Sequence, residues 1–472
     1  MRPLSLLCLW ALLMALPAAA DPPPSAITFK QKISNMVQST GLRGKCGIYI
    51  KVVKTGRVLY NENGNTPMIP ASNLKVLTTA AALDAFGPEH RFETELRGPE
   101  PNSGGIIAGH LYLVGSGDPS FCEPYNTPAT EPFRFFVRQL RKAGVKGVVG
   151  DVVADDSAFD REFRGRGWFE RYLLDDYAAG VAALSVNANL VELIITPGKI
   201  ITNPSSASIR FDNKLKPGSY SEVYVTREDG SDVVTVSGVI APGAVVHRTI
   251  TVDNPALFSA GVFARLLEKG GISHTGSFRL IDRMAESPQV SKLKVYARFK
   301  SPRLIELASQ VNRESDNLFA QHLFKSLGWR HGGHGSAASG EAAVAAFMRK
   351  NGIDTNGLKM VDGCGLSTLD RVSPRQMVEV LGAMWQHEYA QQFIDSLPAG
   401  GQGTLAYRLS GLAVRAKTGT LKGHSGLSGY VVSAYGQTIA FSVLVNDVEG
   451  TWSAVDLEDR VVQAIAGWRD PL

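Results

Sequence analysis

Three short motifs carry the side chains in this sequence that could perform acyl transfer. Ser72-Asn73-Leu74-Lys75 supplies a hydroxyl and an amine, Ser315-Asp316-Asn317 a second hydroxyl and a carboxamide, and Lys417-Thr418-Gly419 a second amine. In a helix, positions i and i+3 lie on one face, so Ser72 and Lys75 can touch. A neutral lysine amine can then take the serine proton and activate the hydroxyl as a nucleophile.

The two lysines also predict a perturbed titration. Like charges in one site repel, so Lys417 is expected to lower the pKa of Lys75 and help keep that amine neutral. Ser72 is predicted to begin a helix over 72–86, where free backbone N–H groups face a developing oxyanion. The pattern therefore predicts a serine enzyme with Ser72 as nucleophile and Lys75 as base.

Each motif alone is weak, because the chain contains a second copy of each type. Ser291-Lys292-Leu293-Lys294 leads into an alternating stretch typical of a strand, in which positions i and i+3 point to opposite faces. Lys54-Thr55-Gly56 lies at a predicted hairpin turn, and Ser185-Val186-Asn187 is assigned a structural role. His331 and His334 lack the H-E-x-x-H pattern of a zinc peptidase.

The chosen motifs, in this order, are the signature of penicillin-recognising serine enzymes. Their flanks resemble those of class C low-molecular-mass penicillin-binding proteins, the D-Ala-D-Ala carboxypeptidase/endopeptidase family. The matching stretches are 70–75, 78–83, 115–120, 312–320, 362–367, 417–421 and 428–431. The resemblance implies a serine D,D-peptidase that cleaves the D-Ala-D-Ala terminus or D,D-crosslinks of peptidoglycan peptides and is acylated by β-lactam antibiotics.

The resemblance also implies an α/β fold, with a β-lactamase/transpeptidase-like sheet flanked by helices and interrupted by nested inserted domains. The stretch between Ser72 and Ser315 is longer than a compact β-lactamase would need, and short alternating segments at 195–252 indicate a β-rich module. The expected division is a signal peptide at 1–20, a catalytic domain at 21–92 and 292–472, an inserted domain at 93–194 and 253–291, and a nested β-rich domain at 195–252.

Periodicity places the secondary structure along the chain. The sequence predicts a strand pair over 46–59 and strands at 414–420, 428–433 and 438–446. Predicted helices cover 72–86, 133–143, 260–269, 304–327, 341–351, 373–385 and 453–468.

The resemblance implies a role for each motif residue. Backbone N–H groups of Ser72 and Thr420 would hold the oxyanion, and Ser315 would relay a proton to the leaving amine. Asn317 would position Lys75 and the substrate amide. The strand residues Lys417, Thr418 and Gly419 would bind the terminal carboxylate. No metal or organic cofactor is needed.

Two further residues are singled out with an alternative beside each. The resemblance makes Asp155 a contact for the amine end of a diaminopimelate-type side chain, whereas a solvated acidic loop is the alternative for 155–159. Cys364 replaces another small residue of the family, and it is interpreted as a packing residue rather than a reactive thiol. Cys46, Cys122 and Cys364 are an odd number, so at least one is unpaired, and whether the other two are bridged stays open.

The beginning of the chain predicts export. Arg2, an apolar run at 4–16 and Ala18-Ala19-Ala20 form a signal-peptide pattern, so the expected location is the periplasm. No later run of 18 apolar residues occurs, so we expect no transmembrane anchor and at most peripheral membrane contact. The 472 residues are 44% hydrophobic with a net charge of +5 scattered along the chain, which is no nucleic-acid footprint.

A non-catalytic wall-binding scaffold and a β-lactamase stay open as alternatives. The sequence also leaves open carboxypeptidase against endopeptidase preference, the third residue of the stem peptide, the role of the inserted domains and whether the chain forms a homodimer.

Overall fold

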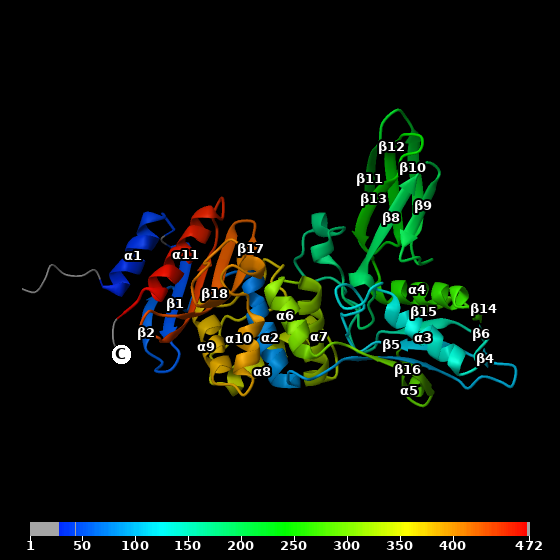
Figure 1. Ribbon diagram of the computed structural model, residues 1–472, viewed down its shortest axis with the longest axis horizontal. Coiled ribbons are helices and arrows are strands. Elements are labelled where there is room, and N and C mark those ends of the chain that lie inside the picture. The colour runs from blue at the N-terminus through cyan, green and yellow to red at the C-terminus, as the bar shows by residue number, and fades with distance from the viewer. Residues whose placement is uncertain (1–27, 43, 470–472) are drawn as a thin grey trace, which may run out of the picture.

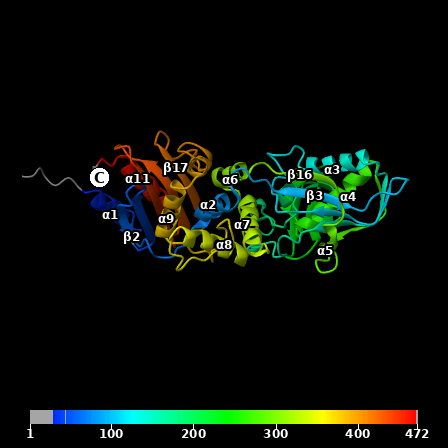
Figure 2. The ribbon, with the colours of Figure 1, turned by 90° about the horizontal axis from the view of Figure 1, so that it is seen from below.

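Two five-stranded sheets form the centres of two lobes that lie end to end (Figures 1 and 2). The computed structural model describes residues 28–42 and 44–469, and the predicted signal at 1–20 lies outside them. The architecture is mixed α/β, as predicted. Within the described ranges, none of the helices has both the length and the apolar composition needed to cross a membrane.

The sheet of the first lobe joins the two ends of the chain. Its antiparallel order is β17-β18-β19-β1-β2, which places β1 and β2 beside the last three strands. The bounds are β1 (Cys46–Val52), β2 (Val58–Glu62), β17 (Val414–Leu421), β18 (His424–Val432) and β19 (Thr438–Val445). β17 is therefore an edge strand, and the predicted strands are all present.

Helices cover both faces of this sheet (Figure 1). One face packs on α1 (Phe29–Ser39) and α11 (Trp452–Ala466), and the other on a helical layer that begins with α2 (Lys75–Phe86). β19 is buried on both sides, because Phe441 packs toward α11 and Leu444 toward the helical layer. The rest of this layer is α6 (Leu304–Arg313), α7 (Asn317–Gly332), α8 (Ala337–Lys350), α9 (Pro374–Trp385) and α10 (Ala390–Ser396).

The second lobe is built on the sheet β15-β7-β5-β3-β16 and a smaller sheet, β14-β6-β4. The first consists of β3 (Glu93–Gly98), β5 (Leu111–Val114), β7 (Val152–Asp155), β15 (Phe278–Leu280) and β16 (Lys294–Lys300), and the second of β4 (Ile106–Ala108), β6 (Gly147–Val149) and β14 (Ser273–His274). The helices are α3 (Glu131–Lys142), α4 (Pro255–Lys269) and the short α5 (Ser287–Val290). β16 pairs with β3, so residues 294–300 lie in this lobe although the expected division assigns them to the catalytic domain.

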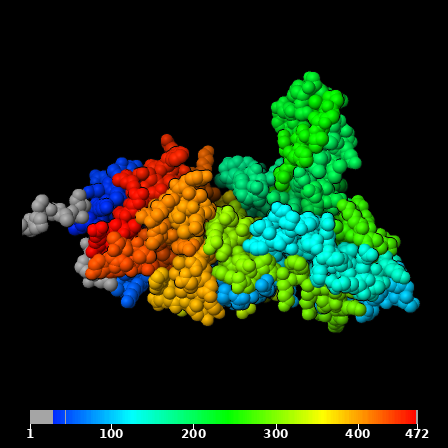
Figure 3. Space-filling model, viewed as in Figure 1, coloured from blue at the N-terminus to red at the C-terminus, as the bar shows by residue number. Residues whose placement is uncertain are grey.

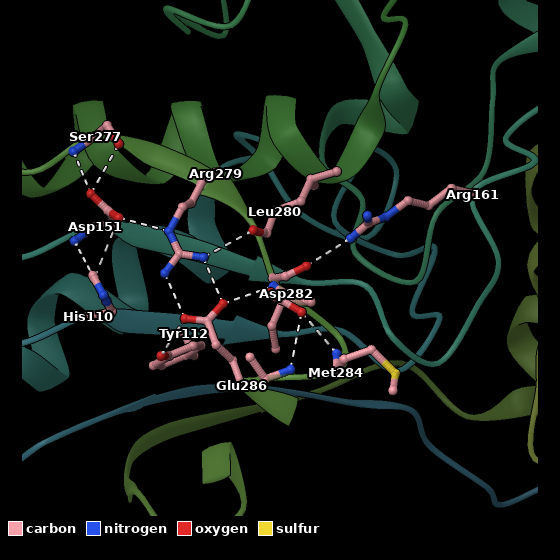
Figure 4. Close-up of polar contacts among 12 residues, drawn as sticks. His110, Tyr112, Asp151, Arg161, Ser277, Arg279, Leu280, Asp282, Met284 and Glu286 are labelled. Carbon is pink, nitrogen blue, oxygen red and sulfur yellow. Dashed lines mark hydrogen bonds and ion pairs between the residues drawn. The ribbon is translucent and has the colours of Figure 1, made fainter. Parts of the chain in front are cut away.

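An ion-pair network joins the edge strand β15 to the rest of the second lobe (Figure 4). The Arg279 guanidinium donates to Asp151 Oδ2 at 2.8 Å and to both carboxylate oxygens of Glu286 at 2.7 Å. Tyr112 donates to Glu286 Oε1 at 3.1 Å. These hydrogen bonds hold the pKa of Glu286 at about 2, because Arg279 favours the ionised carboxylate.

A β-rich arm rises from the second lobe and stands clear of the first (Figures 1 and 3). It contains the sheets β13-β8-β9 and β10-β12-β11. The strands are β8 (Leu190–Thr196), β9 (Lys199–Asn203), β10 (Arg210–Pro217), β11 (Glu222–Arg227), β12 (Val233–Ile240) and β13 (Val246–Thr251). Val234 of the arm belongs to the same hydrophobic cluster as Phe133 of the second lobe, so the core of the arm is continuous with that of the second lobe.

Candidate active site

The turn that carries Ser72 brings its hydroxyl onto the Lys75 amine. Residues Ala71–Leu74 form a short 3₁₀ helix, and α2 begins at Lys75 rather than at Ser72. Ala71 has φ +48°, a left-handed conformation that is strained for a residue other than glycine. Lys75 Nζ lies 2.9 Å from Ser72 Oγ, and the lysine side chain is fully buried. The i, i+3 spacing therefore places the two groups together as expected.

Two further acceptors surround the Lys75 amine. Nζ donates to Asn317 Oδ1 at 2.6 Å and to the backbone carbonyl of Cys364 at 2.7 Å. Asn317 is the first residue of α7, and the Asp316 carboxylate caps this helix by accepting from Phe319 N at 3.0 Å. The amine thus has a fixed position between α2, α7 and the 362–367 loop.

The third motif approaches from the edge strand β17. Lys417 is fully buried, and its Nζ donates to Ser315 Oγ at 2.9 Å and to the backbone oxygen of Thr418 at 2.9 Å. A Cβ at Gly419 would lie 2.6 Å from Asn73 Nδ2 and 2.8 Å from the Pro70 carbonyl oxygen. Glycine at this position therefore lets β17 pack directly on the turn that carries Ser72.

Burial changes the titration of both lysines. Removal from water lowers the pKa of Lys75, while the neighbouring Cys364, Asp362 and Asp316 act in the opposite direction. Burial first, and then the charge of Lys75, lower the pKa of Lys417 well below its usual range. The expectation that repulsion from Lys417 selectively lowers the pKa of Lys75 needs correction, because burial is the main cause and affects both amines.

The remaining predicted strand residues lie beside these groups. Thr418 is half-buried and Thr420 is exposed, and the register pairs them with Leu427 and Ser425 of β18. Ser315 lies immediately before α7 in a left-handed conformation, with φ +60°. The structure therefore gathers all three motifs around one buried pair of amines.

Asp155 lies in a different environment, at the end of β7 in the second lobe. It is buried, its Oδ1 accepts from Ser157 N at 3.0 Å, and burial raises its pKa. Asp156 is fully buried and pairs with Arg161 at 2.9 Å and Arg283 at 3.1 Å. The solvated-loop alternative is therefore wrong. Within the described part of the chain, no hydrogen bond joins Asp155 to the Ser72 group, so its substrate role stays a prediction.

The cysteines are structural. Cys46, Cys122 and Cys364 are all buried and free, which answers the open question of a bridge among them. Burial raises the pKa of the Cys364 thiol well above its usual range, so this side chain is a packing residue and only its carbonyl takes part in the site.

The repeated motif copies lie away from this arrangement. Ser291 follows α5 and its hydroxyl donates to Pro288 O, whereas Lys294 Nζ pairs with Glu100 at 2.7 Å. Lys54-Thr55-Gly56 occupies the turn between β1 and β2. Ser185 is buried, with its hydroxyl 3.1 Å from His322 Nε2. All three have the structural placements that the sequence predicts.

Three partners of the site were not expected from the sequence. Asp362 organises the 362–367 loop, Trp168 donates from its indole Nε1 to Asp362 Oδ2 at 2.8 Å, and Asn317 Nδ2 donates to the Tyr177 carbonyl at 2.8 Å. The family resemblance of the 362–367 stretch is the signal that the sequence offers for Asp362. Within the residues described, no group of three His, Cys, Asp or Glu side chains is placed to hold a metal ion.

Comparisons with known proteins find relatives over nearly the whole chain. The profile of the D-Ala-D-Ala carboxypeptidase 3 (S13) family matches residues 29–468. A D-alanyl-D-alanine carboxypeptidase of Actinomadura sp. (strain R39) is 32% identical, covering 96% of this chain and 88% of its own. The D-alanyl-D-alanine carboxypeptidase DacB of Haemophilus influenzae is 26% identical, covering 92% of this chain and 91% of its own. The crystal structure of penicillin binding protein 4 (dacB) from that organism matches with a TM-score of 0.77 at 26% identity, covering 92% of this chain and 99% of its own.

Proposed function

The chain belongs to the D-Ala-D-Ala carboxypeptidase 3 (S13) family and is a serine-type peptidase, and we propose that Ser72 is the nucleophile with which it cleaves D-alanyl bonds of peptidoglycan peptides. The observation that carries this proposal is the 2.9 Å contact between Ser72 Oγ and the buried Lys75 amine. A buried amine is more readily neutral than an exposed one, which is the state a general base needs.

In the proposed acylation step, Lys75 takes the Ser72 proton as Oγ attacks the carbonyl of the penultimate D-Ala. Backbone N–H groups of Ser72 and Thr420 stabilise the oxyanion. When the tetrahedral intermediate collapses, the C–N bond breaks and Ser315 passes a proton to the leaving amine. The proton that Lys75 took from Ser72 replaces the one that Ser315 gives up, which returns Lys75 to the neutral state, while Lys417 holds the Ser315 hydroxyl at 2.9 Å and keeps its own proton.

Substrate binding in this mechanism uses the edge strand. The Lys417 amine and the Thr418 hydroxyl receive the terminal carboxylate, beside the glycine backbone of residue 419, and Asn317 orients the substrate amide as well as Lys75. Water then hydrolyses the acyl-enzyme and releases the shortened peptide. A β-lactam carbonyl follows the same acylation route and leaves a covalent adduct on Ser72.

The inserted parts of the chain form two units in this proposal. The second lobe runs from Glu93 to Lys300, because β16 pairs with β3. The arm begins at Leu190, because β8 pairs with β13. The catalytic domain is then the remainder after the signal peptide at 1–20. We place the mature enzyme in the periplasm, where peptidoglycan peptides and β-lactams are encountered.

Labelling with a fluorescent penicillin, together with release of D-Ala from a peptide substrate, tests the nucleophile assignment. Ser72→Ala should lose both signals while keeping the wild-type melting temperature. Ser291→Ala, which changes the serine of the repeated S-x-x-K motif, should keep both. A covalent adduct on the Ser72→Ala protein would show that the nucleophile is wrongly assigned.

The same labelling separates the alternative functions. A non-catalytic scaffold forms no adduct, and a β-lactamase releases it quickly, whereas a D,D-peptidase keeps it. The three filled motifs, in mutual contact, support the peptidase.

A further inference from the structure

Two of the three acceptors of the Lys75 amine are held by a segment of the second lobe. This inserted segment, residues 160–179, lies between the first lobe and the base of the arm and is teal in Figure 1. The Tyr177 carbonyl accepts from Asn317 Nδ2 at 2.8 Å, and Asn317 Oδ1 in turn accepts from Lys75. Trp168 Nε1 donates to Asp362, which folds the loop that presents the Cys364 carbonyl to Lys75.

The Asp362 carboxylate is the centre of that loop. Its Oδ1 accepts from the backbone N–H groups of Cys364 at 2.9 Å and Gly365 at 2.6 Å. Its Oδ2 accepts from Ser367 N at 2.8 Å and from Trp168 Nε1 at 2.8 Å. Asp362 is fully buried, and its two carboxyl oxygens accept all four of these N–H donors.

The loop meets both catalytic groups. Its Cys364 carbonyl accepts from Lys75 Nζ, and Gly365 packs against the residue before the nucleophile. A Cβ at Gly365 would lie 1.9 Å from the Ala71 carbonyl oxygen, and this glycine has φ +79°. Thr78 of α2 fixes the loop from a third side, because its hydroxyl donates to the Gly363 carbonyl at 2.7 Å. A shift of Asp362 would therefore move the surroundings of both Ser72 and Lys75.

The inserted segment is itself anchored to the first lobe. Lys325 of α7 is buried, and its Nζ donates to Asp160 Oδ1 at 2.6 Å and to the Glu162 carbonyl at 2.8 Å. Ser367 Oγ donates to the Arg166 carbonyl at 2.7 Å. These hydrogen bonds fix the segment that carries Trp168 against both α7 and the 362–367 loop.

We propose that Trp168 and Asp362 are positioning residues, through which the second lobe holds the Lys75 amine against Ser72. The proposal rests on the proposed function, in which Lys75 is the base for Ser72. It assigns the inserted segment a part in acylation in addition to any contact it makes with substrate.

The charges around Lys75 make this role measurable. Burial lowers the pKa of Lys75, whereas Cys364, Asp362 and Asp316 act to raise it, and Lys417 on β17 is the other buried amine of the site. Asp362→Asn removes one negative charge near Lys75, which should lower the pKa of that amine. A larger fraction of Lys75 should then be neutral at low pH, so acylation should persist to lower pH. A residue that only supports the fold would lower the rate without moving the acid limb of the pH profile.

The experiment measures penicillin acylation rates of the full chain between about pH 4.5 and 10, with melting temperatures. Asp362→Asn should lower the maximal rate on the order of 100-fold, because the loop loses its acceptor, and should move the acid limb to lower pH. Trp168→Phe keeps an aromatic ring, though a smaller one, and removes the indole N–H donor, so it should lower the rate roughly tenfold with only a small fall in melting temperature.

Two matched variants serve as controls. Glu170→Gln removes an exposed carboxylate of the same inserted segment, whose side chain takes part in none of the hydrogen bonds described above, and should leave the acid limb in place. Trp329→Phe makes the same substitution at a tryptophan that is 43% exposed at the far end of α7, and should leave the rate unchanged.

Wild-type rates and an unmoved acid limb in Asp362→Asn would overturn the proposal, and so would an unchanged rate in Trp168→Phe. If Asp362→Asn does not fold, the acylation rate of Trp168→Phe relative to that of Trp329→Phe still tests the proposal. Failure of the proposed function is distinguishable, because it would appear as labelling of Ser72→Ala in the same assay.

Discussion

Lys417 donates to Ser315 across 2.9 Å, and this contact joins the edge strand β17 to the turn before α7. The parallel contact of Lys75 with Ser72 has the same length. The site therefore holds two buried amine–hydroxyl pairs, one assigned to the nucleophile and the other to the leaving group. Because both amines are buried, exposure does not distinguish the roles of the two lysines. Substitutions that change the chemistry of each side chain are needed to tell the roles apart.

The first prediction separates the two lysines. Lys75→Arg should lower penicillin acylation by about 100-fold or more, because arginine cannot deprotonate and act as a base. Lys417→Arg should keep part of the activity, because it retains the cation that receives a carboxylate. Acylation rates of both variants across roughly pH 6 to 10 test this. Higher activity in Lys75→Arg than in Lys417→Arg would require the two roles to be exchanged or abandoned.

The second prediction concerns the approach of β17 to the nucleophile. Gly419→Ala places a methyl group 2.6 Å from Asn73 Nδ2, so the strand must move away from Ser72 and acylation should fall on the order of 100-fold. The control is Gly382→Ala in α9, where a Cβ meets nothing within 4 Å. That variant should acylate normally and gain about 0.5–1 kcal/mol of stability. Equal acylation rates in the two variants would contradict the argument.

A third prediction tests the arm. Val252 N donates to Asn189 O at 2.9 Å, so a short glycine-serine linker can replace residues 190–251. Penicillin acylation should be largely retained, because the motif residues and the inserted segment 160–179 both lie outside the deleted residues. The melting temperature should fall, because the arm shares its hydrophobic cluster with the second lobe. Loss of acylation in a folded deletion protein would mean that the arm shapes the active site.

The fourth prediction concerns acid stability of the second lobe. The folded-state pKa of Glu286 is about 2, below its usual 4.5, so the ionised carboxylate stabilises the fold above about pH 4.5, and this stabilisation disappears as the pH falls toward 2. Glu286→Gln should cost about 1–2 kcal/mol at pH 7 and much less at pH 3. Urea unfolding at both pH values measures the difference. Glu449→Gln, at an exposed carboxylate, should show no such pH dependence, and the prediction fails if the two variants behave alike.

The sequence predicts those parts of the site in which side chains meet through local spacing or through a recognisable motif. Ser72 and Lys75 are three residues apart, and the flanks of Ser315 and Lys417 identify their family. The acceptors from Cys364 and Tyr177 could not be predicted, because they are backbone carbonyls whose positions depend on the packing of distant segments. The same limit applies to the pKa values of Lys75 and Lys417. The sequence identifies the two amines but not the burial that lowers the pKa of each.

The fold was predictable where periodicity is strong and less so at its boundaries. The strands of the first sheet and helix α11 lie close to their expected ranges. The pairing of 294–300 with β3 was not predictable, because an alternating stretch predicts a strand but not the neighbour with which it pairs. The alternating pattern that predicts a β-rich domain at 195–252 likewise does not indicate the cluster that Val234 shares with Phe133.

The pairing of β1 with β19 also determines the order in which the molecule can be completed. Cys46 pairs with Val445, so the first sheet cannot close until the last strands have been synthesised. Residues 93–300 form a continuous stretch and can reach their final packing earlier. Contacts between such distant parts of a chain form slowly, because loop closure costs entropy before the strands stabilise one another. Lys417 lies on one of these late strands, so a chain cut before β17 contains Ser72 without the strand that packs beside it.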